Sequence, residues 1–215
     1  MAGLEPSDLD AIVYATSTPD HFAPGNGVFL QRDLGAGQIP AIDIRTQCSG
    51  FIYGLSIADA YIRTGMFRHV LVVGQEIQST RMDVSTEGRH TAVIFADGAG
   101  AVVAGATDDP TRGILGFDLH GDGAYAEKLW ADGPGAAHHP PVSLQAQEEG
   151  RYWLVMDGKE VFRHAVARMP ESVRAVLAKT GTPLEAVDLV IPHQANLRIS
   201  EVIQKDLGLG AEKAY

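Results

Sequence analysis

Short, uninterrupted apolar runs alternate along this chain with longer segments in which apolar residues recur at helical spacing. The runs are rich in Val, Ile and Ala and end at turn-forming residues, which is typical of strands buried on both faces. The predicted strands are Ala11–Ala15, Ala41–Arg45 and His69–Gly74, and the predicted helices are Ser49–Thr64, Asp157–Thr180 and Ala195–Leu207. Buried strands that alternate with helices predict an α/β fold, in which mainly parallel sheets are covered on both faces.

Other segments have weaker patterns. Ala92–Ala96 and Gly100–Ala104 are two apolar runs separated by Asp97-Gly98-Ala99, so we expect two strands joined by a tight turn. Gly113–His120 and Asp188–Pro192 are each expected to form a further strand. Residues 121–150 are expected to form a loop, because glycine and proline accumulate toward the end of this segment.

Composition and charge exclude several classes of protein. The 215 residues carry a net charge of −10 and no run of Lys or Arg, whereas a nucleic-acid-binding protein has a concentrated basic face. No stretch reaches the roughly 18 consecutive apolar residues that indicate a membrane-spanning helix. The first residues, MAGLEPSD, lack the basic segment and apolar run of a secretory signal. A single cysteine excludes an internal disulfide and fits a reducing cytoplasm, so we expect a cytoplasmic protein.

Cys48 is a candidate nucleophile because it lies between a predicted strand and the start of a predicted helix. The unpaired backbone N–H groups and partial positive charge of a helix N-terminus favour a thiolate and lower the pKa of a cysteine. The same N–H groups can stabilise the oxyanion that forms when a thiolate attacks a thioester. Gly50, which has no side chain, leaves room for a substrate. From its position alone, Cys48 is either a nucleophile or an inert core cysteine.

His193 is a second candidate, at the end of the predicted strand Asp188–Pro192. Ligands of parallel α/β sheets gather at the carboxyl ends of the strands, so Cys48 and His193 can meet at one rim. The residues alone also fit a structural histidine bonded to the backbone, or a segment that caps the following helix.

Six blocks of the sequence carry a more specific signal. They are Cys48–Phe51 followed by Tyr53–Leu55, His69–Gly74, Phe95–Gly100, His120–Gly123, Met156–Phe162 and Pro192–Arg198. In order and spacing these blocks resemble the β-ketoacyl-acyl-carrier-protein synthase III family of thiolase-fold condensing enzymes. The resemblance runs from Ala11 to Leu209, and it favours the nucleophile interpretation of Cys48.

The resemblance implies a thiolase-like fold with α-β-α-β-α layers. Residues 1–112 then correspond to the later part of its N-terminal half, and residues 113–215 to the early part of its C-terminal half. We expect both ends of the fold to be absent from this sequence. The catalytic asparagine of the family matches no residue here, because it follows the histidine by some thirty residues; Asn196 is interpreted as structural.

The chemistry implied by the resemblance needs no metal and no organic cofactor. Cys48 takes an acyl group from acyl-CoA, and malonyl-acyl carrier protein then loses carbon dioxide and attacks the acyl-cysteine. His193 matches the histidine that stabilises negative charge on the malonyl thioester oxygen. The family also implies a homodimer, formed by extension of the central sheet.

Further site residues follow from the resemblance with less specificity. Arg89 and Arg198 match basic residues that contact coenzyme A or the carrier protein, although each is also explained as a solvated surface charge. The predicted substrate-binding residues of the second half are Met156, Gly158, Phe162 and Ala195. Phe22 and Ala23 match the acyl pocket, where acetyl-selective members have a bulky aromatic residue in place of Ala23. We therefore expect a roomier pocket that accepts medium or longer acyl chains.

Two other functions keep this fold. One is an enzyme that condenses two acyl-CoA molecules or acts in secondary metabolism, and the other is a non-catalytic partner subunit. The presence of both Cys48 and His193 disfavours the non-catalytic alternative. His138-His139 is a poor metal candidate because no Cys or further His lies nearby at ligand spacing. Gly98-Ala99-Gly100 lacks the Lys-Ser/Thr of a phosphate-binding loop.

Overall fold

A computed structural model describes residues 3–214, which form two compact units. The first unit comprises the chain up to Ile77 together with Asp97–Leu115. The second comprises Gln78–Ala96 and the chain from Gly116 onward. The predicted division into thiolase halves at residues 112 and 113 stays a prediction, although the chain enters the second unit for the last time close to that point, after Leu115.

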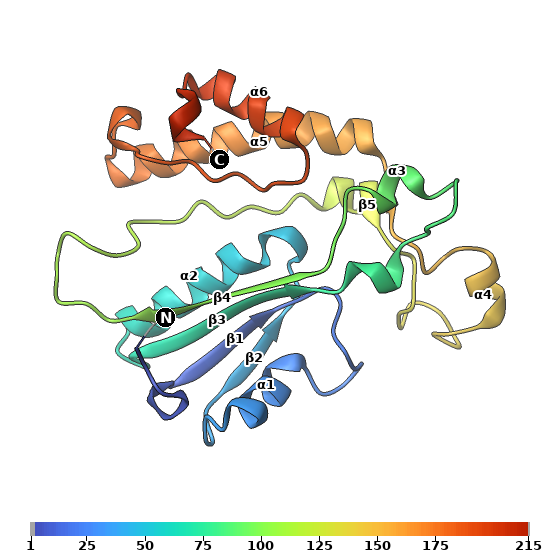
Figure 1. Ribbon diagram of the computed structural model, residues 1–215, viewed down its shortest axis with the longest axis horizontal. Helices are drawn as coiled ribbons and strands as arrows, with labels where there is room; N and C mark the ends of the chain where they lie inside the picture. The colour runs from blue at the N-terminus through green and yellow to red at the C-terminus, as the bar shows by residue number, and fades with distance from the viewer. Residues whose placement is uncertain (1–2, 215) are drawn as a thin grey trace. The chain divides into compact units, whose positions relative to one another are not determined.

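The first unit is built on a four-stranded sheet with the strand order β2-β1-β3-β4 (Figure 1). The central strand β1 (Ala11–Ala15) runs parallel to both β2 (Ala41–Ile44) and β3 (His69–Glu76). The edge strand β4 (Gly98–Gly105) is antiparallel to β3. All five residues of β1 are buried, as its uninterrupted apolar sequence predicts. In this register the carboxyl ends of β2, β1 and β3 lie at one edge of the sheet.

Helices α1 (Asn26–Leu34) and α2 (Gly50–Arg63) cover opposite faces of this sheet (Figure 1). Side chains alternate between the faces of a strand, and the core of the unit divides accordingly. The α2 face buries Ala11, Val13, Val70 and Val72 around Ala58 of the helix. The other face packs Ile12, Tyr14 and Val73 against Leu30 of α1. The predicted α/β layering is therefore confirmed for this unit, although the sequence pattern did not reveal α1.

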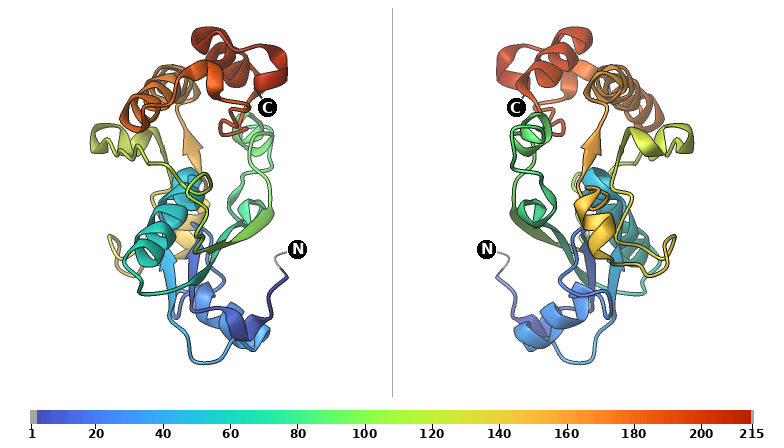
Figure 2. Two further views of the ribbon diagram at one scale, coloured as in Figure 1. Left: turned by 90° about the vertical axis from the view of Figure 1, so that its left-hand side faces the viewer. Right: turned by 90° about the vertical axis from the view of Figure 1, so that its right-hand side faces the viewer.

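The second unit is dominated by α5 (Gly158–Thr180) and α6 (Leu197–Leu207), which pack against each other (Figure 1 and Figure 2). Ile199, Ile203 and Leu207 recur at intervals of four and form one buried stripe on α6. The stripe contacts apolar residues of α5, among them Phe162 and Met169. The unit also contains α3 (Arg89–Ala92), α4 (Leu144–Glu148) and an antiparallel pair formed by β5 (Leu129–Trp130) and β6 (Val155–Met156).

Short 3-10 helices link these elements. They are η1 (Pro6–Asp8), η2 (Gln47–Ser49), η3 (Gln78–Arg81), η4 (Gly123–Lys128), η5 (Leu184–Ala186) and η6 (Ala211–Lys213). No helix within residues 3–214 combines the length and the apolar character that crossing a membrane requires.

Three predicted strands are wrong. The segment Ala92–Ala96 is the end of α3 followed by irregular chain, and Gly98 belongs to β4 and not to a turn. Gly113–His120 is irregular, and Asp188–Pro192 makes a single bridge, from Val190 to Ala214. A strand needs a neighbour for its backbone N–H and C=O groups. In the part of the chain that the structure describes, Ala92–Ala96 and Gly113–His120 are paired with no strand and Asp188–Pro192 has only this one bridge, so their apolar sequences alone do not produce strands.

Candidate active site

Cys48 lies in a tight turn between β2 and α2, at the carboxyl edge of the sheet. The turn is the 3-10 helix η2, and its first residue, Gln47, has a φ of 49°. A non-glycine residue with this left-handed backbone costs roughly 1–3 kcal/mol and persists only where the surrounding structure holds it. Ser49 provides part of that support, because its N–H and hydroxyl donate to the Thr46 carbonyl oxygen at 3.3 and 2.8 Å. The turn presents Cys48 as an exposed residue.

The turn rests directly on the central strand. Gly50, the first residue of α2, is buried, and a Cβ atom there would lie 2.9 Å from the Cβ of Ala15. One turn of helix further on, Gly54 lies against Val72 in the same way. The sequence suggested that Gly50 leaves room for a substrate, whereas the structure gives another reason for the glycine. It allows the start of α2 to approach β1 closely.

The electrostatic surroundings of Cys48 differ from the expected ones. Neighbouring atoms partly desolvate the thiol although the residue is exposed, and this desolvation raises its pKa; the negative charge of Glu76 raises the pKa further. The direction of this shift is opposite to the one expected from the helix N-terminus.

His193 lies in irregular chain that leads into α6, in the second unit. The residue is exposed, but neighbouring protein atoms partly desolvate the ring and lower its pKa, which favours the neutral imidazole at pH 7. Asn196 is the N-cap of α6: its side-chain oxygen accepts a hydrogen bond of 2.9 Å from the Arg198 N–H. This capping role agrees with its interpretation as structural.

The predicted substrate-binding residues lie in the second unit, apart from Phe22 and Ala23. Gly158 begins α5 immediately after β6, which contains Met156, and the Met156 methyl carbon lies 3.8 Å from the position of a Gly158 Cβ. Phe162 follows one turn later and packs on the buried stripe of α6. Ala195 precedes the α6 N-cap.

The remaining predicted contacts are exposed. Arg89 begins α3 and Arg198 lies in the first turn of α6, and both have exposed side chains. Phe22 and Ala23 lie in the loop between β1 and α1 of the first unit. Phe22 is 95% exposed, so it fills no cavity within that unit.

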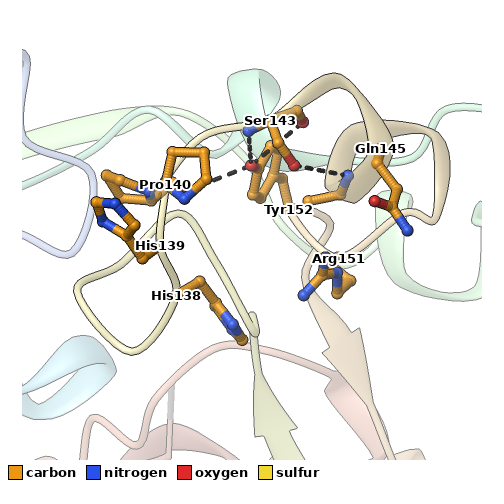
Figure 3. Close-up of a pocket in the computed structure, with 9 residues that line it drawn as sticks. His138, His139, Pro140, Ser143, Gln145, Arg151 and Tyr152 are labelled. Atoms are coloured by element: carbon orange, nitrogen blue, oxygen red, sulfur yellow. Dashed lines mark hydrogen bonds between the residues drawn. The ribbon is translucent and has the colours of Figure 1, made fainter.

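The second unit also contains a pocket of about 220 Å³ lined by His138, His139 and Arg151 (Figure 3). Tyr152 forms one wall, and its hydroxyl accepts a hydrogen bond of 2.7 Å from the Ser143 N–H. His138 Nε2 lies 2.9 Å from an Asp132 carboxylate oxygen, which holds the ring in the loop. No group of three or more His, Cys, Asp or Glu side chains suited to a metal ion occurs within residues 3–214.

Comparison with known proteins relates both units to one family. Residues 42–123 match the family model of 3-oxoacyl-[acyl-carrier-protein (ACP)] synthase III. The chain is 44% identical over 216 residues to a β-ketoacyl-[acyl-carrier-protein] synthase III of Granulibacter bethesdensis, and the match covers 99% of this chain and 63% of that protein. The corresponding protein of Rhizorhabdus wittichii is 42% identical over 212 residues, with 99% of this chain and 63% of the relative covered. The chain thus spans 63% of the length of these curated relatives.

Solved structures give the same relationship. The crystal structure of 3-oxoacyl-[acyl-carrier-protein] synthase III from Aquifex aeolicus has a TM-score of 0.88 and 39% identity, over 100% of this chain and 63% of that one. This similarity confirms the predicted thiolase-like fold. A priming β-ketosynthase from a polyketide biosynthetic pathway has a TM-score of 0.82 and 34% identity, over 99% of this chain and 61% of that one. In sequence and in fold the chain is therefore similar to the β-ketoacyl-acyl-carrier-protein synthase III family of thiolase-fold condensing enzymes.

Proposed function

We propose that this chain carries the nucleophile and the histidine of a condensing enzyme that joins an acyl group to a malonyl unit by decarboxylative Claisen condensation. The observation that carries the proposal is the exposed Cys48, held on a strained turn where the carboxyl ends of three parallel strands meet. The 42–44% identity to β-ketoacyl-[acyl-carrier-protein] synthases III over 99% of the chain supports the same reaction.

In the first half-reaction, the Cys48 sulfur attacks the thioester carbonyl carbon of an acyl-CoA. A new carbon–sulfur bond forms, the bond to coenzyme A breaks, and coenzyme A leaves as a thiol after it gains a proton. The proton of the Cys48 thiol supplies this requirement, so the half-reaction balances. The N–H groups at the start of α2 are suited to stabilise the oxyanion.

In the second half-reaction, malonyl-acyl carrier protein loses carbon dioxide, and the resulting enolate carbon attacks the acyl-cysteine carbonyl. The Cys48 sulfur leaves, and the product is a β-ketoacyl thioester on the carrier. A neutral His193 ring donates a hydrogen bond to the thioester oxygen while its negative charge develops. The reaction uses no metal or organic cofactor, since loss of carbon dioxide drives it. We assign the protein to the cytoplasm and to a homodimer by analogy with the family.

The acyl substrate is proposed to be of medium length or longer, because the small Ala23 stands where acetyl-selective relatives have a bulky aromatic side chain. Turnover of octanoyl-CoA is expected to exceed that of acetyl-CoA. Equal or faster turnover of acetyl-CoA contradicts this assignment.

A second candidate function is chain initiation in polyketide synthesis, which uses the same half-reactions. The similarity to a priming β-ketosynthase from such a pathway favours it. An assay of malonyl transfer from the carrier proteins of fatty-acid and polyketide synthesis distinguishes the two. Condensation of two acyl-CoA molecules predicts product formation with no malonyl carrier present.

The proposal is tested by intact-protein mass spectrometry after incubation with acetyl-, octanoyl- and palmitoyl-CoA. A mass increase of one acyl group is expected, and it should be absent from Cys48→Ala. A folded wild-type protein that gains no acyl group from any of the three thioesters refutes the proposed reaction. Release of the acyl group on addition of malonyl-carrier then tests the second half-reaction.

A further inference from the structure

Two carboxylates tie β1 to β3, one at each end of this strand pair. At the amino end, Asp10 accepts hydrogen bonds from the N–H groups of Arg68 and His69 at 2.8 and 2.9 Å. At the carboxyl end, Glu76 accepts from the Ser17 N–H and the Ser17 hydroxyl, both at 2.8 Å, and from the Thr18 hydroxyl at 2.9 Å. Each carboxylate therefore holds β1 and β3 together, Asp10 at the amino ends of the two strands and Glu76 at their carboxyl ends.

The turn that contains Cys48 lies at the same end of the sheet as Glu76. Because side chains alternate along β1 and β3, Ala15, Gly74 and Glu76 share the face covered by α2. Gly50 approaches Ala15, and the Phe51 side chain lies 3.6 Å from the position of a Gly74 Cβ. The bonds of Glu76 to Ser17 and Thr18 hold the chain immediately after Ala15, so they fix the support beneath the turn.

Glu76 also acts on the thiol through its charge, which raises the pKa of Cys48 in addition to the effect of desolvation. Asp20 and Asp97 line a hollow together with Glu76, whereas the following charged groups of this unit are placed differently. Asp43 of β2 accepts from the Asn26 and Gly27 N–H groups at the start of α1, on the opposite face of the sheet. Arg45, after β2, is exposed. Asp59 and Arg63 pair with each other at the far end of α2.

We propose that Glu76 is a positioning residue for the nucleophile: its hydrogen bonds to Ser17 and Thr18 hold the end of β1 beneath the Cys48 turn. The inference rests on the proposed function of Cys48 and adds a residue to it. A thioester carbonyl must meet the sulfur in one geometry, so a fixed turn favours acylation more than it favours reaction with a small probe.

The test compares Glu76→Gln with Asp10→Asn in the protein that contains the complete chain. Each substitution removes one negative charge from a carboxylate that joins β1 to β3, and only the charge of Glu76 acts on the pKa of Cys48. The rate of Cys48 alkylation by iodoacetamide is measured from pH 6 to pH 10 by intact-protein mass spectrometry. We expect the midpoint of the profile to shift to lower pH in Glu76→Gln and to stay at the wild-type value in Asp10→Asn. A Glu76→Gln midpoint equal to or above the wild-type value refutes the inference that the charge of Glu76 raises the pKa of Cys48.

The positioning role is tested by dividing the rate of acylation by octanoyl-CoA by the rate of alkylation by iodoacetamide. Acylation depends on sulfur geometry more than alkylation by a small probe does, so the ratio should fall in Glu76→Gln and in Ser17→Ala, which removes one donor to Glu76 but no charge. If the Glu76→Gln protein does not fold, Ser17→Ala still tests the positioning role. Unchanged ratios in both variants refute the positioning role.

These outcomes are separable from failure of the proposed function. If the wild-type protein is alkylated at Cys48 but never acylated, the condensing reaction is wrong, and the alkylation profiles still decide whether Glu76 controls the thiol. If the wild-type protein is acylated and both variants behave like Asp10→Asn, the proposed function stands and the role of Glu76 is refuted.

Discussion

Replacing Gly50 with alanine tests the close contact between α2 and β1 that supports the cysteine turn. The added Cβ would lie 2.9 Å from the Ala15 Cβ, against 3.4–4 Å for ordinary contacts. Neither carbon can rotate away, so β1 or α2 must move by about half an ångström. Overpacking of this kind costs about 1–3 kcal/mol, and the higher helix propensity of alanine offsets about 1 kcal/mol of that cost. We therefore expect a net loss of up to about 2 kcal/mol, which lowers Tm by up to about 8 °C in a protein of this size.

Differential scanning calorimetry of the single and double variants measures this effect. Gly158→Ala is the matched control, because Gly158 also begins a helix but a Cβ there would meet only the Met156 methyl carbon, at 3.8 Å. Combining Gly50→Ala with Ala15→Gly removes the clash, so the two changes should be non-additive by at least about 0.5 kcal/mol. A Tm for Gly50→Ala at or above that of the wild-type protein, or strict additivity with Ala15→Gly, refutes the argument.

Three further predictions concern charged groups. Asp43→Asn weakens the hydrogen bonds from two N–H groups at the start of α1, and urea unfolding should show a loss of about 1–3 kcal/mol; an unchanged free energy of unfolding contradicts this. The pKa of Asp10 is lowered chiefly by the His69 N–H and then by the Arg68 N–H, so its stabilisation is present above the unfolded pKa of about 3.9 and is lost as the pH falls through the lower folded pKa. The Tm difference between wild-type and Asp10→Asn should accordingly shrink on acidification from pH 7, and a difference that stays constant down to pH 2 refutes it. The pKa of His193 is lowered by desolvation, so its NMR titration midpoint should lie below about 6.5, and a midpoint at or above that value is the contrary result.

The sequence predicted the elements whose signals are local. The strands at Ala11–Ala15 and His69–Gly74 are uninterrupted buried runs, and both are confirmed, although β3 extends to Glu76. The helix predicted at Asp157–Thr180 is confirmed as Gly158–Thr180 despite Pro170 within it. The predicted strand at Ala92–Ala96 is wrong because apolar character does not by itself supply a partner strand, and Val93 is 80% exposed.

The site was predictable to the extent that it depends on short motifs. Cys48 at a strand-to-helix turn and His193 before a helix were both visible in the order of residues. Glu76 was not, because it is 28 positions from Cys48 and its role arises from strand pairing, which brings it opposite Ser17. The raised pKa of Cys48 was missed for the same reason: the helix terminus is local in sequence, whereas the opposing charge and the desolvation come from residues that only the fold brings near.

The strand order of the first unit also bears on how the protein folds. The central strand β1 precedes both of its neighbours in the chain, and the bond between Ser17 and Glu76 joins residues 59 positions apart. Such non-local pairing slows folding, because the entropy of a long closed loop is lost before the contacts form. During synthesis, β1 keeps one edge unpaired until residue 76 has left the ribosome. The support beneath Cys48 is therefore completed in the same late step that closes the sheet, so a chain that stalls earlier exposes an unpaired strand edge and lacks the Glu76 contacts beneath the Cys48 turn.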